Sequence, residues 1–226
     1  MIFAHGGGCV PGWRGGRGRQ AARCDTGGVF RLGKPSQAWI DGQLEAARGL
    51  GASSPSLLSL EGGRTSGRLP FGFAHDRSSS VIAHGEAGFA AARSAFGQWG
   101  QFDLGWVRVA NPLTPVARGR YVGVEAQTAG LWSLNISRIM ETVDTATRFG
   151  FLYATTRMQV EEGEERFVLE LDGASGQVWY LIEAVSRPRT ALTRVGWPFA
   201  RVMQHQFARD SHVHMRYVVS RACVNC

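Results

Sequence analysis

The feature that most constrains the fold is a succession of strand-like runs followed by one long amphipathic helix. Six runs rich in β-branched and aromatic residues, separated by turn residues, occupy positions 104–109, 120–128, 131–143, 148–156, 165–172 and 177–186. Consecutive strands joined by short loops pair antiparallel. From Leu192 to Val218 apolar residues then recur every three or four positions, which predicts a helix. The chain therefore predicts an antiparallel meander packed against a terminal helix.

Before these runs the sequence predicts a short helix, a seventh strand and a second helix, at residues 35–49, 72–82 and 84–98. In the second helix, Phe89, Ala92 and Phe96 share one face. Proline is unfavourable deep inside a helix, so we expect the main terminal helix to begin at Pro198, after a lead-in turn at 190–197.

These elements predict an α+β fold, in which a curved seven-stranded antiparallel sheet wraps a long C-terminal helix. This order of elements resembles the helix-grip arrangement of START-like and Bet v 1-like proteins, and the analogy concerns the fold only. We expect a single domain over residues 35–220, with a linker at 50–70. Residues 1–34 contain ten glycines and predict a flexible tail, and residues 221–226 a short C-terminal tail.

The last hairpin, residues 163–188, raises the question of what covers its second strand. That strand is apolar on both faces, with Val178, Tyr180 and Ile182 on one and Trp179, Leu181 and Val185 on the other. A strand of this kind needs cover on both sides. One set should meet the terminal helix, and the helix at 35–49 is a candidate cover for the other.

Several stretches resemble, in order, the family catalogued as domain of unknown function 1990, also uncharacterised protein family 0548: LPFGFAHDR (69–77), FGQWGQFDLGWVRV (96–109), GLWSLNISRIMETVD (130–144), FGFLYATT (149–156), GEERF (163–167), VWYLIEAVSRP (178–188) and GWPFARVMQHQFARDS (196–211). The resemblance covers roughly residues 35–220 and implies a shared fold, not a reaction. Family members tend to have a histidine shortly before the GEE triplet, where this chain has Gln159. Glutamine does not titrate, so proton transfer is not expected there.

Candidate ligand-binding residues lie among the predicted strands. Arg138 shares an apolar face, so it should form an internal ion pair, with Glu170 or Glu183, or else anchor the carboxylate or phosphate of a greasy ligand. The aromatic residues are either ordinary core or the lining of a cavity, with Asn135 and Tyr153 as its polar fixtures: Phe149, Phe151, Tyr153, Trp179 and Tyr180.

Four residues are candidates for acid–base chemistry. Asp103 is a turn or cap residue, or a base at a cavity mouth, and His75 lies near a predicted strand end. Glu164 and Glu165 belong to an acidic run at 161–165. We expect this run to be a solvated hairpin tip, although one of its members could meet an arginine of the terminal helix.

No cofactor or metal site is expected. His205 and His212 predict a solvated helix face without a ligating partner, and the four cysteines lie at the two ends of the chain. Five of the seven net positive charges fall within residues 1–35, so the predicted domain has no strongly basic surface. RGGRGR at 14–19 is a single copy of an RNA-binding pattern without interleaved aromatic residues, so we do not expect nucleic acid as a partner. No run is long and apolar enough for a membrane helix, so we expect a cytoplasmic protein.

Three functions are compatible with these patterns. The favoured one is a binding module for a small hydrophobic or amphipathic molecule, with Arg138 or Tyr153 at its polar end. The second is an enzyme on the same scaffold, and the third is an envelope-associated or interaction protein. The sequence leaves the oligomeric state and the identity of the ligand open.

Overall fold

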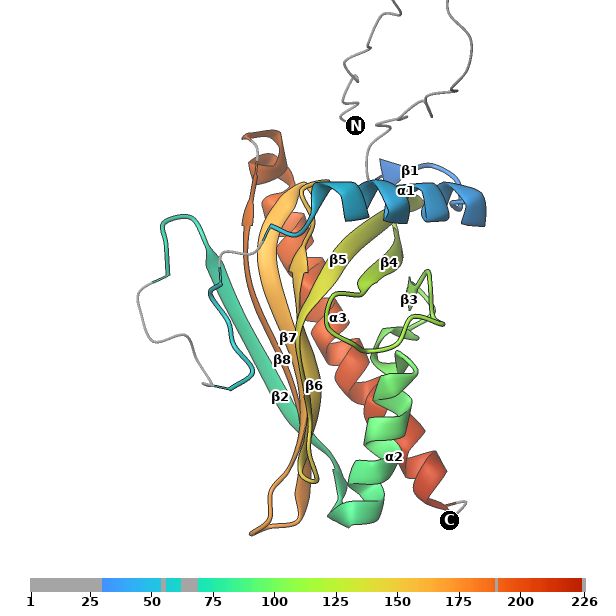
Figure 1. The fold of residues 1–226 in the computed structure, drawn as a ribbon, viewed down its shortest axis with the longest axis vertical. Helices are drawn as coiled ribbons and strands as arrows, with labels where there is room; N and C mark the ends of the chain where they lie inside the picture. Colours follow the sequence, from blue (N-terminus) through green and yellow to red (C-terminus); the bar gives the residue numbers. More distant parts are fainter. Residues whose placement is uncertain (1–29, 54–55, 62–68, 190, 225–226) are drawn as a thin grey trace, which may run out of the picture.

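The computed structural model describes residues 30–53, 56–61, 69–189 and 191–224 (Figure 1). The predicted tail lies outside the described residues up to position 29. The described helices are α1 (Gln37–Leu50), α2 (Gly85–Gly97) and α3 (Ala191–Val224), with a 3-10 turn at Gly100–Phe102. The described strands are β1 (Phe30–Arg31), β2 (Ala74–His84), β3 (Val107–Val109), β4 (Tyr121–Thr128), β5 (Leu131–Asp144), β6 (Arg148–Thr155), β7 (Glu161–Leu171) and β8 (Gln177–Pro188).

The sheet has the strand order β2-β8-β7-β6-β5-β4-β3, and every neighbouring pair is antiparallel. In Figure 1 this curved sheet has α3 running along one face, with α2 beside the C-terminal half of α3. The predicted helix-grip fold is therefore confirmed. One strand was not predicted: β1, at the end of the expected tail, pairs with β5 through Phe30 opposite Ser133.

The acidic run belongs to a strand and not to a solvated loop, because β7 begins at Glu161. Its side chains alternate between the two faces of the sheet. On the outer face, the face opposite α3, Glu162 accepts hydrogen bonds from Arg187, and Glu164 accepts them from three backbone amides. These partners stabilise the carboxylates that the sequence analysis expected to be solvated. The prediction that the acidic run is a solvated hairpin tip is therefore wrong.

The terminal helix is longer than expected. It begins at Ala191 and continues past Pro198, so the predicted start at Pro198 is wrong, and it runs to Val224. Pro198 is inside this helix and has no backbone N–H, so it removes one hydrogen bond from the helix. The packing of the residues after it on the sheet offsets that loss.

The middle of the inner face, the face towards α3, is packed with aromatic rings. Phe151 of β6 and Phe167 of β7 are fully buried, and their ring centroids are 5.1 Å apart. Phe96 of α2 packs against Phe151, and Met215 of α3 belongs to the same cluster. The middle of the sheet therefore packs on α2 and α3 through a core of contacting aromatic side chains.

The two apolar faces of β8 have different covers. Tyr180 and Ile182 face the inner core. Val185 packs in the opposite direction, in one cluster with Leu58 and Leu60 of residues 56–61, which we call the covering segment. The candidate cover named from the sequence is wrong: α1 packs instead on β4 and β5, because its apolar side matches Leu134 and Ile136.

Candidate functional site

Three alternate side chains on the inner face of β6 lie in three different surroundings. Phe149 lines a surface groove beside α2, Phe151 lies in the solid core, and Tyr153 begins a polar group further along the strand. The aromatic residues predicted as either core or cavity lining thus divide between these roles. Tyr180 is fully buried on the same face, whereas Trp179 is 37% exposed on the other.

The polar group, which we call the Tyr–Glu cluster, consists of Tyr153, Glu161, Glu165 and Gln204. Tyr153 and Glu165 are cross-strand partners, and the Tyr153 hydroxyl donates a 2.6 Å hydrogen bond to Oε2 of Glu165. Glu161 lies four residues before Glu165 on the same strand and hence on the same face. From α3, Nε2 of Gln204 donates to Oε2 of Glu161 at 3.4 Å. The cluster therefore joins β6, β7 and the N-terminal half of α3.

The carboxyl groups of the cluster favour their neutral forms. Burial raises the pKa of Glu165 to about 7. The hydrogen bond from Tyr153 lowers this pKa, and the nearby charge of Glu161 raises it. Burial also raises the pKa of Glu161 to about 7. The pKa of Tyr153 lies well above its usual value, because the ring is buried and Glu165 is close. Near neutral pH, the cluster can therefore exchange protons as well as accept hydrogen bonds.

No cation of the described residues pairs with Glu161 or Glu165. Two nearby arginines pair with other carboxylates, Arg201 with Asp76 of β2 and Arg187 with Glu162. A third, Arg189, donates to the backbone carbonyl of Glu161 at 3.3 Å and not to its carboxyl group. Glu165 and Glu161 are both half-buried, so they are not sealed from solvent. The cluster is thus a pair of acidic groups with hydrogen-bonding capacity left over, on the inner face of an apolar scaffold.

A second polar network lies deeper, where β8 meets α3. Ser211 donates to the carbonyl oxygen of Gln101, so the Tyr180 hydroxyl donates to Ser211, both at 2.9 Å. The ring nitrogens of His212 contact the hydroxyls of Ser78 and Ser80 at 3.0 and 2.9 Å. The expectation of a solvated His212 is wrong, because this side chain is 7% exposed.

Two acid–base candidates lie on the outer face, away from the cluster. Nε2 of His75 is 2.7 Å from Oε1 of the buried Glu183, which also accepts two hydrogen bonds from Arg166. Glu164 accepts from the amides of residues 56–58 and so fastens the covering segment. Both arrangements stabilise the fold, and neither side chain faces the Tyr–Glu cluster.

The remaining predicted residues are dispersed. Arg138 lies on the outer face, where its guanidinium carbon is 5.9 Å from the ring centroid of Tyr121, and no ion pair to it occurs among the described residues. Asp103 is exposed and follows the 3-10 turn as its cap, and Asn135 is exposed on β5. Of the eleven candidate residues, the structure therefore brings only Tyr153 and Glu165 together in the polar cluster.

Sequence reasoning missed Glu161 and Gln204 as members of the site. The signal for Glu161 was present, since Glu161, Gly163 and Glu165 alternate with the rest of β7 once the strand is extended backwards. Gln204 gave no such signal. Gln159, which occupies the position of the family histidine, is 5% exposed and donates to the carbonyl of Ile136.

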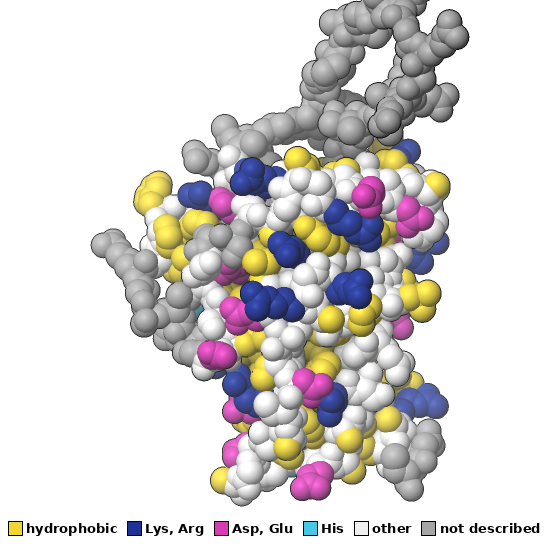
Figure 2. All heavy atoms as spheres, viewed as in Figure 1, with side chains coloured by type: hydrophobic (Ala, Val, Ile, Leu, Met, Phe, Trp, Pro, Cys, Tyr) yellow, Lys and Arg dark blue, Asp and Glu magenta, His cyan; other side chains and the backbone are white. Residues whose placement is uncertain are grey.

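The surface charges, the helices and the possible metal ligands were the basis for expectations about nucleic acid, membranes and metal ions. In Figure 2 arginine side chains are interspersed with acidic and apolar ones over the face shown. None of the helices in the described part of the chain has the length and apolarity needed to cross a bilayer. Within the same residues, no three His, Cys, Asp or Glu side chains are grouped as metal ligands. Cys223 is free and exposed, and the other three cysteines lie outside the described residues.

The chain is similar in sequence to a protein family and to individual proteins of several organisms. The family profile described as "Domain of unknown function (DUF1990)" matches residues 59–213. A UPF0548 protein of Deinococcus radiodurans is 32% identical over 192 residues, which are 80% of this chain and 94% of that relative. A UPF0548 protein of Dictyostelium discoideum is 38% identical over 134 residues, covering 54% of this chain and 62% of its own length.

Two solved structures resemble the chain at low sequence identity. Ara h 8.0201 gives a TM-score of 0.43 at 16% identity, over 66% of this chain and 99% of its own. The di-domain ARO/CYC BexL gives 0.47 at 10% identity, over 66% of this chain and 51% of its own. These likenesses concern the course of the chain and carry no statement about function.

Proposed function

The chain belongs to the DUF1990 family, whose description assigns no activity, so a function has to be inferred from the structure itself. We propose that the protein binds an amphipathic small molecule on the inner face of its sheet. The observation that carries the proposal is the Tyr–Glu cluster, in which Glu161 and Glu165 have no cation partner among the described residues. The ligand's polar end would meet these carboxyls. Its apolar part would lie along neighbouring aromatic residues such as the half-buried Phe207.

The physical argument is that carboxyl groups taken partly out of water are normally paired. The raised pKa values of Glu161 and Glu165 indicate that the protein alone does not compensate the charged forms. A ligand group that donates hydrogen bonds or carries positive charge would supply that compensation. An alkylamine or an alkyl alcohol therefore suits the cluster better than an alkyl carboxylate, whose negative charge would be repelled.

Calorimetric titration with decylamine, decanol and decanoate at pH 7.5 tests the proposal, because the three probes differ only in the head group. We expect saturable binding of the amine, weaker binding of the alcohol and none of the carboxylate. The variant Glu165→Gln should weaken amine binding at least tenfold. Glu170→Gln, on the outer face of the same strand, should leave it unchanged and is the matched control.

Two outcomes would overturn the proposal. One is the failure of all three probes to bind, together with the absence of small molecules when the natively purified chain is examined by mass spectrometry. The other is amine binding that Glu165→Gln leaves unchanged. Binding of decanoate in preference to the amine would retain a binding protein but reject the cluster as the site of the head group.

A second candidate function is acid–base catalysis on the same ligand. It is favoured by one observation: Glu165 has a pKa of about 7 and lies within hydrogen-bond reach of Tyr153. The predicted acid–base residues Asp103, His75 and Glu164 do not support it, since none lies in the cluster. If Glu165 catalyses a reaction, the ligand recovered from Glu165→Gln should differ in mass from that recovered from the unmodified chain, whereas a binding protein returns the same compound.

A further inference from the structure

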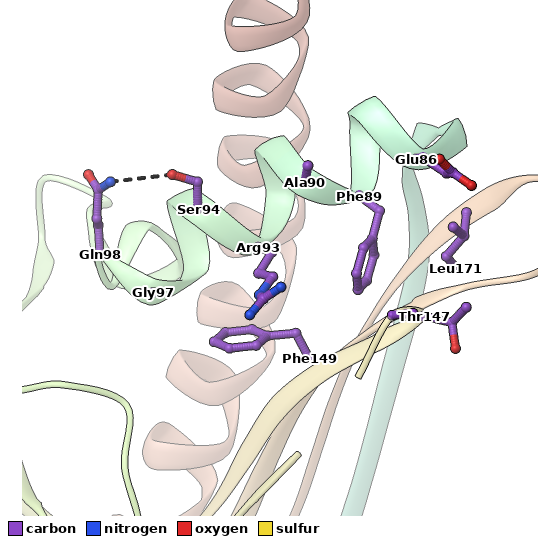
Figure 3. Close-up of a pocket in the computed structure, with 11 residues that line it drawn as sticks. Glu86, Phe89, Ala90, Arg93, Ser94, Gly97, Gln98, Thr147, Phe149 and Leu171 are labelled. Carbon is purple, nitrogen blue, oxygen red and sulfur yellow. Dashed lines mark hydrogen bonds between the residues drawn. The ribbon is translucent and has the colours of Figure 1, made fainter. Parts of the chain in front are cut away.

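A groove with a volume of about 810 Å³ lies between α2 and the turn that joins β5 to β6 (Figure 3). Its walls come from α2, from Ala146, Thr147 and Phe149, and from Leu171 at the end of β7. The solid core around Phe151 separates it from the Tyr–Glu cluster. The groove is therefore a separate place on the molecule, and what it binds can be tested independently of the function proposed above.

Two aromatic rings and a leucine form the apolar part of the groove wall. Phe89 of α2 projects towards the sheet, and Phe149 and Leu171 line the opposite side (Figure 3). Phe149 is supported edge-on by Phe96, with ring centroids 6.0 Å apart. A volume of several hundred Å³ with aromatic walls is typical of sites for small organic molecules.

Arg93 is the cation that lines this groove. The guanidinium of Arg93 lies 5.4 Å from the ring centroid of Phe149 and donates a 2.7 Å hydrogen bond to Asp144. Both side chains of this pair are about half exposed, at 47% and 51%. Surface ion pairs of this kind contribute little to stability, so an incoming anion can take the place of Asp144 at small cost. Arg93 also retains donors that face no partner among the described residues.

Polar side chains lie at both ends of the groove. Ser94 and Gln98 lie beyond Arg93 at one end, and Glu86 lies near Phe89 and Leu171 at the other (Figure 3). Because Glu86 would repel an anion, the negative group of a ligand belongs at the Arg93 end. The negative end of the α2 dipole opposes an anion near Gln98, so the guanidinium must supply the attraction.

We propose that this groove is a second small-molecule site, which takes a flat apolar molecule ending in a carboxylate. The carboxylate meets the guanidinium of Arg93, and the apolar body lies between Phe89, Phe149 and Leu171. Arginine suits this role because its planar donors match a carboxylate while its face remains stacked on a ring. No residue of the Tyr–Glu cluster takes part.

Titration of the full chain with 1-naphthylacetate, followed by amide chemical shifts, locates the site directly. We expect saturable shifts at Ser94, Gln98 and Thr147, and no shifts at Tyr153 or Glu165. Arg93→Gln should weaken binding at least tenfold, whereas Arg118→Gln, which removes an exposed arginine outside the groove, should not. The uncharged analogue 2-(1-naphthyl)ethanol should bind at least tenfold more weakly than the carboxylate.

A second pair of variants tests the location by filling the groove. Ala90 and Ala87 are both exposed on α2, but only Ala90 lines the groove. Ala90→Trp should abolish binding, and Ala87→Trp should leave it intact. The proposal is overturned if no saturable shift occurs at millimolar probe, if Arg93→Gln binds as tightly as the unmodified chain, or if the shifts concentrate at the Tyr–Glu cluster.

Discussion

The hydroxyl of Tyr153 on β6 donates a 2.6 Å hydrogen bond to Oε2 of Glu165 directly across the strand pair. This contact fixes a titratable carboxyl on the inner face, where the aromatic core of Phe151 and Phe167 excludes water on one side. Because the surroundings favour the neutral carboxyl, the protonation of Glu165 is coupled to folding as well as to any ligand.

Replacing Glu165 with glutamine should change how stability depends on pH. The pKa of Glu165 is about 7 in the folded chain and near 4.5 in the unfolded chain, so the folded state binds more protons between these values. The contribution of Glu165 to stability is therefore full below pH 4.5 and is lost as pH rises to 7. In urea unfolding, Glu165→Gln should be more stable than the unmodified chain at pH 8, by roughly 1–2 kcal/mol after solvent screening.

Glu162 is the matched control for this measurement, because it lies on the same strand with the opposite shift. The hydrogen bond from Arg187 lowers its pKa. Its stabilising contribution is therefore present at neutral pH and is lost as pH falls through the folded pKa. Glu162→Gln should be less stable than the unmodified chain at pH 8. Equal effects of the two substitutions at that pH would contradict the assignment of Glu165 as a neutral-favouring group.

His212 should remain uncharged well below the pH at which an exposed histidine becomes protonated. Burial lowers its pKa to about 4, and the charge of Arg216 acts in the same direction. Between pH 6.5 and 4 the unfolded chain binds the extra proton, so the stability that His212 contributes is lost as pH falls across this range. Ring-proton shifts in the folded protein should stay constant from pH 8 to about 5; a midpoint near 6.5 would show that the ring is solvated.

Arg166 and Glu183 should be strongly coupled, since both are almost completely buried and joined by two hydrogen bonds of 2.6 and 3.0 Å. Arg166→Met removes the buried arginine from the Glu183 carboxylate and leaves it His75 and the more distant Arg77, so the loss should be about 3 kcal/mol of unfolding free energy. The double variant Arg166→Met/Glu183→Leu should lose much less than the sum of the two single variants. Additive losses in this double-mutant cycle would mean that the pair does not act as a unit.

The fold was predictable because its signals are local and repeated. Strand alternation and turn residues place six strands between positions 104 and 186, and α3 follows from its apolar spacing. The candidate site was less predictable, because the face that a polar residue occupies depends on strand register. A four-residue error at the start of β7 concealed the opposite roles of Glu164 and Glu165. For Arg138, alternation correctly gave an apolar face but could not show that this face is the outer one.

The outcome for Glu164 gives the last prediction. Its carboxylate accepts hydrogen bonds of 2.7, 2.7 and 2.8 Å from the amides of Ser56, Leu57 and Leu58, and it is 3% exposed. Glu164→Gln replaces one accepting oxygen with a donor, so at least one of these amides loses its partner, at a cost of about 1–3 kcal/mol. The covering segment should then separate more readily from β7 and β8. Amide hydrogen exchange at Leu57 and Leu58 should accelerate at least tenfold in Glu164→Gln and remain unchanged in the exposed control Glu170→Gln. Unchanged protection in both variants would show that the apolar contacts of Leu58 and Leu60 hold the segment without the carboxylate.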